Sequence, residues 1–298
     1  DKPDIRFTVH LAMTKSAEAF AQEAGRAGRD RAVSVCAVLF TDSIPSEGND
    51  ILEEGISIET AKDRMDAATQ KKQERDDAAT QFYLHSTSYL GAEVERTAIL
   101  GICSRYLVPG PSEVRRGERQ FWEVSLQQED VDLAMIGPED AGIDNTPATL
   151  RGHAPGRNAE DKKKAVPGIE RIIYRLTLLG MIRDYTIDYS AGNRVFRLRV
   201  EQRSDEEIVA NLFDYIGRYA TVDRRTKAQS HFESAPYSDV LSKSVDTLCW
   251  FVYEEIESRR RQAMFNMRQL LRESRDGMDF GNRLDKMLST TALTQEVF

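Results

Sequence analysis

The chain has 298 residues, 40% of them hydrophobic and 30% charged, with a net charge of −8. This balance indicates a folded protein of two or three domains and excludes a largely disordered chain. No apolar run reaches the roughly 18 residues of a membrane helix. Three cysteines lie far apart in sequence (Cys36, Cys103 and Cys249) and favour free thiols in a reducing, cytoplasmic setting.

Residues 1–42 have the pattern of the end of an α/β domain. Residues 5–10 alternate as a strand, and a helix is expected to begin near Thr14 or Ser16, because either side chain can cap it. Residues 33–40 form a nearly continuous apolar strand of the kind buried in parallel sheets. The order strand, helix, loop, strand is the one in which an α/β motor domain ends.

The loop between this helix and the second strand carries the most informative sequence of the chain. It reads Q-E-A-G-R-A-G-R-D over residues 22–30, so that Arg26 and Arg29 each follow a glycine. Guanidinium groups bind phosphate in a bidentate manner, and glycine lets the backbone turn tightly and approach a ligand closely. The loop therefore predicts contact with the γ-phosphate of a nucleoside triphosphate.

Together with D-K-P-D-I-R-F over residues 1–7 and K-S at 15–16, this loop resembles the second motor domain of RecQ-family DNA helicases in superfamily 2. The resemblance implies that Arg26 and Arg29 contact ATP across the cleft between two motor domains, with Arg29 as the arginine finger. It also implies that Gln22 places the nucleotide or the attacking water.

The predicted catalytic residues are thus Arg29, Arg26 and Gln22, and Asp30 completes the ATP-binding set. Asp30 is expected to orient an arginine or to link the ATP state to DNA, with local helix termination as the alternative. Arg6 is expected either to approach the DNA backbone or to be a solvated strand end.

Two other motor motifs do not occur in the sequence. There is no G-x-x-x-x-G-K-[ST] phosphate loop, and no D-E-x-H or D-E-x-D run that would hold Mg²⁺. We therefore expect this chain to be the C-terminal part of a longer helicase and to be unable to hydrolyse ATP alone. ATP and Mg²⁺ are expected cofactors of the intact enzyme, with the Mg²⁺ ligands outside this chain.

Residues 43–106 are predicted to be a helical region, with a charged helix or connector over 59–79 and a helix over 82–102. RecQ proteins hold a zinc-binding subdomain with four cysteines at this place. Here Cys103 is the only cysteine of the region, so a four-thiolate site cannot form and we expect no zinc or other structural metal. The next segment, 107–165, contains most of the prolines and an acidic middle, and is predicted to be an irregular insertion or linker with a short strand at Phe121 and Trp122.

Residues 166–203 are predicted to form a winged-helix domain. A helix over 168–182 has apolar residues at helical spacing and Gly180 at its C-cap, and strands over 185–189 and 194–200 follow as a hairpin. From residue 151 to residue 203 the chain has 12 Lys or Arg against 6 Asp or Glu. This local basic balance predicts DNA contact, with an ordinary solvated face as the alternative. The predicted DNA-binding residues are Arg194, Arg197, Arg199, Lys162, Lys163 and Lys164.

Residues 204–298 are predicted to be a helical C-terminal region. Ser204 and Glu207 have the spacing of a capping box, and a long helix is expected from about 239 to 275, ended by Gly277. The arginines at 259–261 lie close to glutamates on this helix, so pairs within the helix are expected there.

The expected fold is thus an α/β motor-domain remnant (1–42), followed by a mostly helical region with a winged helix and a helical tail. The expected function is that of the C-terminal part of an ATP-dependent 3′–5′ DNA helicase resembling RecQ, acting in DNA repair or recombination. Single-stranded, branched and duplex DNA and ATP are the expected partners. Two alternatives stay open: a DNA-binding or partner-docking module with a vestigial motor segment, and another superfamily 2 motor such as an RNA helicase. RNA helicases usually read H-R-x-G-R-x-G-R, whereas Gln22 and Asp30 match RecQ.

Overall fold

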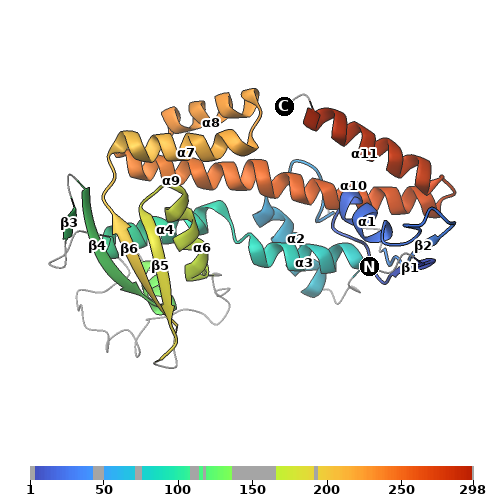
Figure 1. Ribbon diagram of the computed structural model, residues 1–298, viewed down its shortest axis with the longest axis horizontal. Helices are drawn as coiled ribbons and strands as arrows, with labels where there is room; N and C mark the ends of the chain where they lie inside the picture. Colours follow the sequence, from blue (N-terminus) through green and yellow to red (C-terminus); the bar gives the residue numbers. More distant parts are fainter. Residues whose placement is uncertain are drawn as a thin grey trace. The chain divides into compact units, whose positions relative to one another are not determined.

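The computed structural model describes residues 4–42, 50–70, 76–107, 114–116, 119–135, 166–190 and 194–296, without the side chains of 69–70, 114–116, 119 and 290–296. The chain forms two compact units (Figure 1). Unit 1 comprises residues 1–89 and 253–298, and unit 2 comprises residues 90–252. The boundaries between the five predicted segments stay predictions.

Unit 1 begins with a small α/β segment. Strand β1 (Phe7–His10) leads to helix α1 (Ala17–Ala24) and strand β2 (Val35–Val38), and the two strands pair in parallel. Ser16 caps α1, because its hydroxyl accepts a hydrogen bond from the Ala19 N–H at 3.1 Å. The predicted strand–helix–strand order is therefore confirmed, with Ser16 as the cap.

The helices of unit 1 come from both ends of the chain. They are α2 (Ile58–Gln70), α3 (Asp77–Ser88), α10 (Ser258–Arg275) and α11 (Phe280–Glu296). Helix α10 contacts α1, α3 and α11, and buries Met264 and Met267. The tail of the chain therefore belongs to the same core as the α/β segment.

One prediction for the α/β segment is wrong. The strand over 33–40 was expected to be buried, yet Val35 is 47% exposed and Leu39 is 59% exposed. On β1, Phe7 and Val9 are also exposed. Parallel strands become buried when further strands and helices cover both faces of a sheet. A pair of strands is too small a sheet to achieve this burial.

Unit 2 contains a four-stranded antiparallel sheet in the order β3-β4-β6-β5. Its strands are β3 (Val114–Arg116), β4 (Arg119–Leu126), β5 (Ile182–Asp188) and β6 (Val195–Glu201). The predicted hairpin is confirmed, and β4 contains the strand predicted at Phe121 and Trp122. The described part of 107–165 is thus not irregular, since helix α5 (Gln128–Ala134) also lies in it.

The helices of unit 2 pack on one another and on the sheet. They are α4 (Ala92–Tyr106), α6 (Ile169–Leu178), α7 (Asp205–Tyr219), α8 (Val222–Ser234) and α9 (Val240–Trp250). Helix α6 follows the predicted periodicity and buries its apolar face, and Gly180 after it has a φ of 78°, a left-handed conformation that favours glycine. The capping box of Ser204 and Glu207 is also confirmed at the start of α7.

The predicted long helix is confirmed as a continuous helical run from Val240 to Arg275. It includes a π-helical stretch, η2 (Phe251–Glu257), that sequence periodicity does not reveal. The expected pairs within this helix are present as Arg259–Glu255 (2.9 Å) and Arg261–Glu257 (3.0 Å). None of the described helices is both long enough and apolar enough to span a membrane.

Candidate functional site

The predicted arginines lie on the loop of residues 25–34, between α1 and β2, which we call the arginine loop. Arg26, Arg29, Gln22 and Asp30 are all exposed to solvent. Gly25 is the C-cap of α1, and its N–H donates to the Ala21 carbonyl at 2.9 Å. The end of the helix thus presents the predicted phosphate-contacting residues on one surface loop.

The backbone of the arginine loop is attached through Gly28 to Ile5, two residues before β1. The Gly28 N–H donates to the Ile5 carbonyl (2.9 Å), and the Gly28 carbonyl accepts from the Arg31 N–H (2.8 Å). Gly28 has a φ of 66°, and a Cβ added there would lie 2.8 Å from Ser34 Oγ and 3.0 Å from the Ala32 carbonyl oxygen. The second glycine of the motif is therefore required by the loop conformation itself.

Gly28→Ala is expected to destabilise unit 1 by about 1–3 kcal/mol, because it adds a close contact to the cost of a left-handed backbone. Gly55→Ala is the matched control: Gly55 has a φ of 81°, but a Cβ there meets nothing within 4 Å. The loss of stability in each variant is measured from the hydrogen exchange rates of the α1 amides at increasing urea concentrations. Equal losses in the two variants would show that the contacts with Ser34 and Ala32 are readily relaxed.

Asp30 attaches the loop to Arg6, the residue immediately before β1. Its carboxylate accepts two hydrogen bonds from the Arg6 guanidinium, at 2.6 and 3.1 Å, and one from the Ala32 N–H at 3.1 Å. These bonds, that of Arg6 first, hold the pKa of Asp30 below its ordinary value. The predicted aspartate thus pairs with the arginine that immediately precedes β1.

A third attachment involves His10, which sequence reasoning missed. The His10 Nδ1 lies 3.1 Å from Glu23 Oε2, and its ring packs on Phe20 with centroids 4.9 Å apart. The His10 side chain is only 9% exposed. The alternation of β1 places Thr8 and His10 on one face. This alternation is the sequence pattern from which the inward position of His10 could be predicted. His10 thereby fixes the last turn of α1, which also carries Gln22.

The predicted DNA-binding arginines of unit 2 each have an interaction partner. Arg194 pairs with Glu170, and Arg197 pairs with Asp188 at 2.7 Å. Arg199 lies over the Phe121 ring at 5.0 Å. Both β6 arginines point away from the buried Phe196, Leu198 and Val200, as the alternation predicts. Lys162, Lys163 and Lys164 lie outside the described residues.

A buried cluster of opposite charges in unit 1 was not predicted. Arg268 on α10 is 2% exposed and donates to Asp42, Asp50 and Asp76 over 2.9–3.2 Å. Arg272 adds two hydrogen bonds to Asp42, at 2.6 and 2.8 Å. We call these five residues the carboxylate cluster. Its members lie up to 230 positions apart in sequence, so no local pattern reveals it.

Acid is expected to weaken the carboxylate cluster. Burial alone raises the pKa of Asp42, but hydrogen bonds from Arg272 and the charge of Arg268 outweigh it and hold the pKa below the ordinary 3.8. Stability from this ionised carboxylate is therefore complete above about pH 4 and is lost as the pH falls through the lowered pKa. The test measures the stability of Asp42→Asn and of the wild type at each pH from the hydrogen exchange of α10 amides. The difference in stability between the two proteins should shrink below pH 4.

Asp276→Asn is the control for this measurement, because Asp276 lies just after α10 with its side chain 71% exposed. Its difference from the wild type should stay small at every pH. An Asp42→Asn difference that does not change between pH 6 and pH 3 would contradict the assignment.

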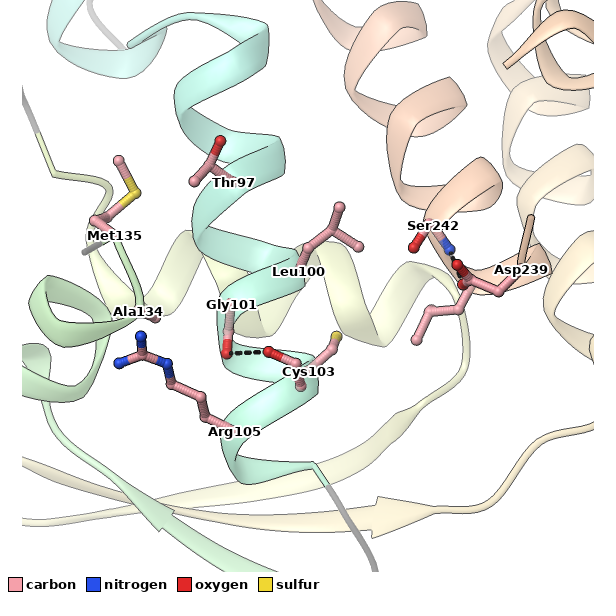
Figure 2. A pocket seen from close by; sticks show the side chains of 11 residues that line it. Thr97, Leu100, Gly101, Cys103, Arg105, Ala134, Met135, Asp239 and Ser242 are labelled. Atoms are coloured by element: carbon pink, nitrogen blue, oxygen red, sulfur yellow. Dashed lines mark hydrogen bonds between the residues drawn. The ribbon is translucent and has the colours of Figure 1, made fainter. Parts of the chain in front are cut away.

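A pocket of about 490 Å³ lies in unit 2 between α4, the end of α5 and the start of α9 (Figure 2). Arg105 at its edge donates to the Leu133 carbonyl at 2.7 Å, and Asp239 accepts from the Ser242 N–H at 2.7 Å as the cap of α9. Burial, with a smaller effect of Asp239, raises the pKa of the Cys103 thiol to about 12. This thiol is therefore not a nucleophile near neutral pH.

Among the residues that the structure describes, no group of three or more His, Cys, Asp or Glu side chains is arranged to hold a metal ion.

Comparison with known proteins finds short similar segments in RecQ-like helicases. The chain is 52% identical over 46 residues to RecQ-like DNA helicase blm-1 of Caenorhabditis elegans, covering 15% of this chain and 5% of that protein. It is 56% identical over 39 residues to the probable ATP-dependent DNA helicase RecS of Bacillus subtilis, covering 13% and 8%. It is 36% identical over 64 residues to ATP-dependent DNA helicase Q-like 2 of Arabidopsis thaliana, covering 21% and 9%.

The aligned part thus spans less than a tenth of each of these three relatives. No protein-family model matches the chain. No solved structure matches it significantly. The short matches nevertheless agree in one kind of protein: segments of 39 to 64 residues of this chain are similar to RecQ-like DNA helicases.

Proposed function

We propose that this chain is the C-terminal part of an ATP-dependent DNA helicase that unwinds DNA in the 3′–5′ direction during repair or recombination. The observation that carries the proposal is the arginine loop, which presents Arg26 and Arg29 at the surface. Three contacts support the loop and the helix turn before it: Gly28 to Ile5 and Asp30 to Arg6, both just before β1, and Glu23 of α1 to His10 of β1. A preorganised loop suits a group that must meet a transferring phosphoryl group without rearrangement.

In this proposal the two arginines act on ATP held by the rest of the motor. Arg29 stabilises the charge that develops on the γ-phosphoryl group, Arg26 contacts the same phosphate, and Gln22 places the attacking water. Asp30 keeps the loop in place by accepting hydrogen bonds from Arg6 and from the Ala32 N–H. Mg²⁺ would be bound by residues outside this chain and would neutralise charge on the phosphates when present.

The exposed apolar residues of the α/β segment fit this reading. Phe7 and Val9 on β1 and Val35 on β2 are between 47% and 64% exposed. They share one face, since Phe7 is opposite Val35 in the parallel register. Parallel sheets carry apolar side chains on both faces because both faces are covered. We infer that the remainder of a motor domain covers this face.

The DNA contact is proposed for unit 2. Helix α6 followed by the β5–β6 hairpin fits a winged helix, with Arg197 and Arg199 on the solvent side of the hairpin. The partners of these arginines are acidic or aromatic, so a phosphate group would compete with them. The free thiols of the described cysteines are compatible with a cytoplasmic protein.

The test is ATP hydrolysis and unwinding of a 3′-tailed duplex by the intact protein, with DNA and RNA in parallel. Turnover stimulated by DNA and not by RNA supports the proposal. Stimulation by RNA alone would favour an RNA helicase. DNA binding without any ATP hydrolysis would favour a binding module with a vestigial motor segment, and would remove the proposed function.

A further inference from the structure

Helix α10 carries a buried arginine that holds three parts of unit 1 together. The Arg268 Nε donates to Asp42 (3.0 Å), and its two terminal nitrogens donate to Asp50 (2.9 and 3.1 Å) and Asp76 (3.2 Å). One guanidinium thereby joins three carboxylates, two of which are less than a tenth exposed, and Arg272 adds a second positive charge beside Asp42. Such charge-assisted, multiply bonded arginines fix the geometry of the groups they join.

The aspartates held by Arg268 lie at the base of the arginine-loop segment. Asp42 follows β2 by four residues, and Asp76 is the cap of α3. The neighbouring Asp77 accepts from the Met13 N–H at 2.8 Å and from the Thr41 N–H at 3.4 Å. Residues 13–41 include α1, the arginine loop and β2, so both ends of this segment meet at one carboxylate beside the cluster.

The C-terminal helices α10 and α11 also pack against the segment of residues 13–41. Phe20 of α1 packs edge-on against Phe280 of α11, with ring centroids 5.1 Å apart, and α1 also contacts α10. The face of the strand pair that carries Phe7, Val9 and Val35 is exposed, so it adds little to the core of unit 1. The position of the arginine loop therefore depends on α10 and α11, which lie more than 200 residues later in the sequence.

We propose that α10 and α11 are a built-in part of the helicase motor segment, and that Arg268 is a positioning residue for the arginine loop. It acts through Asp42, four residues after β2, and through Asp76, the cap of α3, which precedes the Asp77 carboxylate at which both ends of the segment 13–41 meet. The proposal rests on the proposed function for its kinetic consequence, but its structural consequence can be measured in this chain alone.

The test compares Arg268→Gln with Arg259→Gln, a matched control on the same helix whose pair with Glu255 is partly exposed. In the chain itself, Arg268→Gln should raise the hydrogen exchange rates of amides in 25–41 about tenfold or more, while amides of α6 keep wild-type rates. In the intact helicase it should lower kcat about tenfold with KM for ATP changed less than about threefold, because a displaced arginine weakens the transition state most. Arg259→Gln should match the wild type in both assays, and Arg268→Lys should recover part of the loss.

The proposal is overturned if Arg268→Gln keeps both the wild-type hydrogen exchange rates of amides in 25–41 and the wild-type kcat. If that variant does not fold, Arg272→Gln replaces it, since Arg268 keeps its three carboxylates there while Asp42 loses two bonds. Faster exchange at 35–42 with reduced kcat then supports positioning, and unchanged values reject it. If the wild type shows no DNA-stimulated turnover, the proposed function fails, and the exchange rates alone decide the positioning role.

Discussion

Arg29→Ala is expected to lower DNA-stimulated ATP turnover of the proposed helicase by about 10³- to 10⁵-fold, the range in which arginine fingers contribute. ATP binding should change far less, because the guanidinium interacts most strongly with charge that develops in the transition state. The loop should keep its conformation, since its attachments run through Gly28, Asp30 and Glu23. Steady-state kinetics, together with binding of a fluorescent ATP analogue, separate the two effects.

Arg31→Ala is the matched control for this prediction. Arg31 lies on the same loop, is exposed and is two residues from Arg29, but belongs to neither glycine–arginine pair. It should therefore retain turnover within a few-fold of the wild type. If Arg29→Ala hydrolyses ATP as fast as Arg31→Ala, the arginine loop does not contact the nucleotide and the helicase reading loses its main support.

Local features of the fold could be predicted because local residues determine them. Helix α6 and the left-handed Gly180 that follows it, the capping box of α7 and the β5–β6 hairpin all depend on spacing within about 20 residues. The alternation that directs Arg197 and Arg199 to solvent is likewise contained in seven residues. These elements could be predicted from the sequence alone.

Features that depend on distant contacts were missed. The division of the chain joins residues 1–89 to residues 253–298, and the carboxylate cluster links Asp42 to Arg272. Arg268 appears in the sequence as one more charged residue on a helix rich in arginine, so its near-complete burial was not foreseen. The apolar pattern of β2 was interpreted correctly as a strand, but its burial depends on neighbours that two strands do not supply.

Unit 2 contains a buried ion pair whose disruption is expected to have the largest effect on stability. Glu95 on α4 is 1% exposed and accepts from Arg175 (3.1 Å) and Arg171 (3.2 Å) on α6. Burial lowers the pKa of Arg175, but the charge of Glu95 outweighs it and raises the pKa above its ordinary value. Glu95→Gln keeps the shape of the side chain and leaves a buried guanidinium without its counter-charge.

Glu95→Gln is therefore expected to lower the free energy of unfolding of unit 2 by about 3–5 kcal/mol, the cost of breaking a buried pair from one side. Glu93→Gln, two residues earlier on the same helix and exposed, should cost less than about 0.5 kcal/mol. Both tryptophans of the chain, Trp122 and Trp250, lie in unit 2, so tryptophan fluorescence during urea denaturation reports this unit.

Adding Arg175→Met to Glu95→Gln distinguishes an unpaired charge from simple loss of packing. Removing the guanidinium removes the uncompensated charge, so the double variant should be more stable than Glu95→Gln alone, although a second side chain has been replaced. If the two losses add instead, the cost of Glu95→Gln arises from packing around α4 and α6, and the ion pair contributes little. The sign of this coupling therefore decides whether the charge pair or the apolar contacts between α4 and α6 stabilise this part of unit 2.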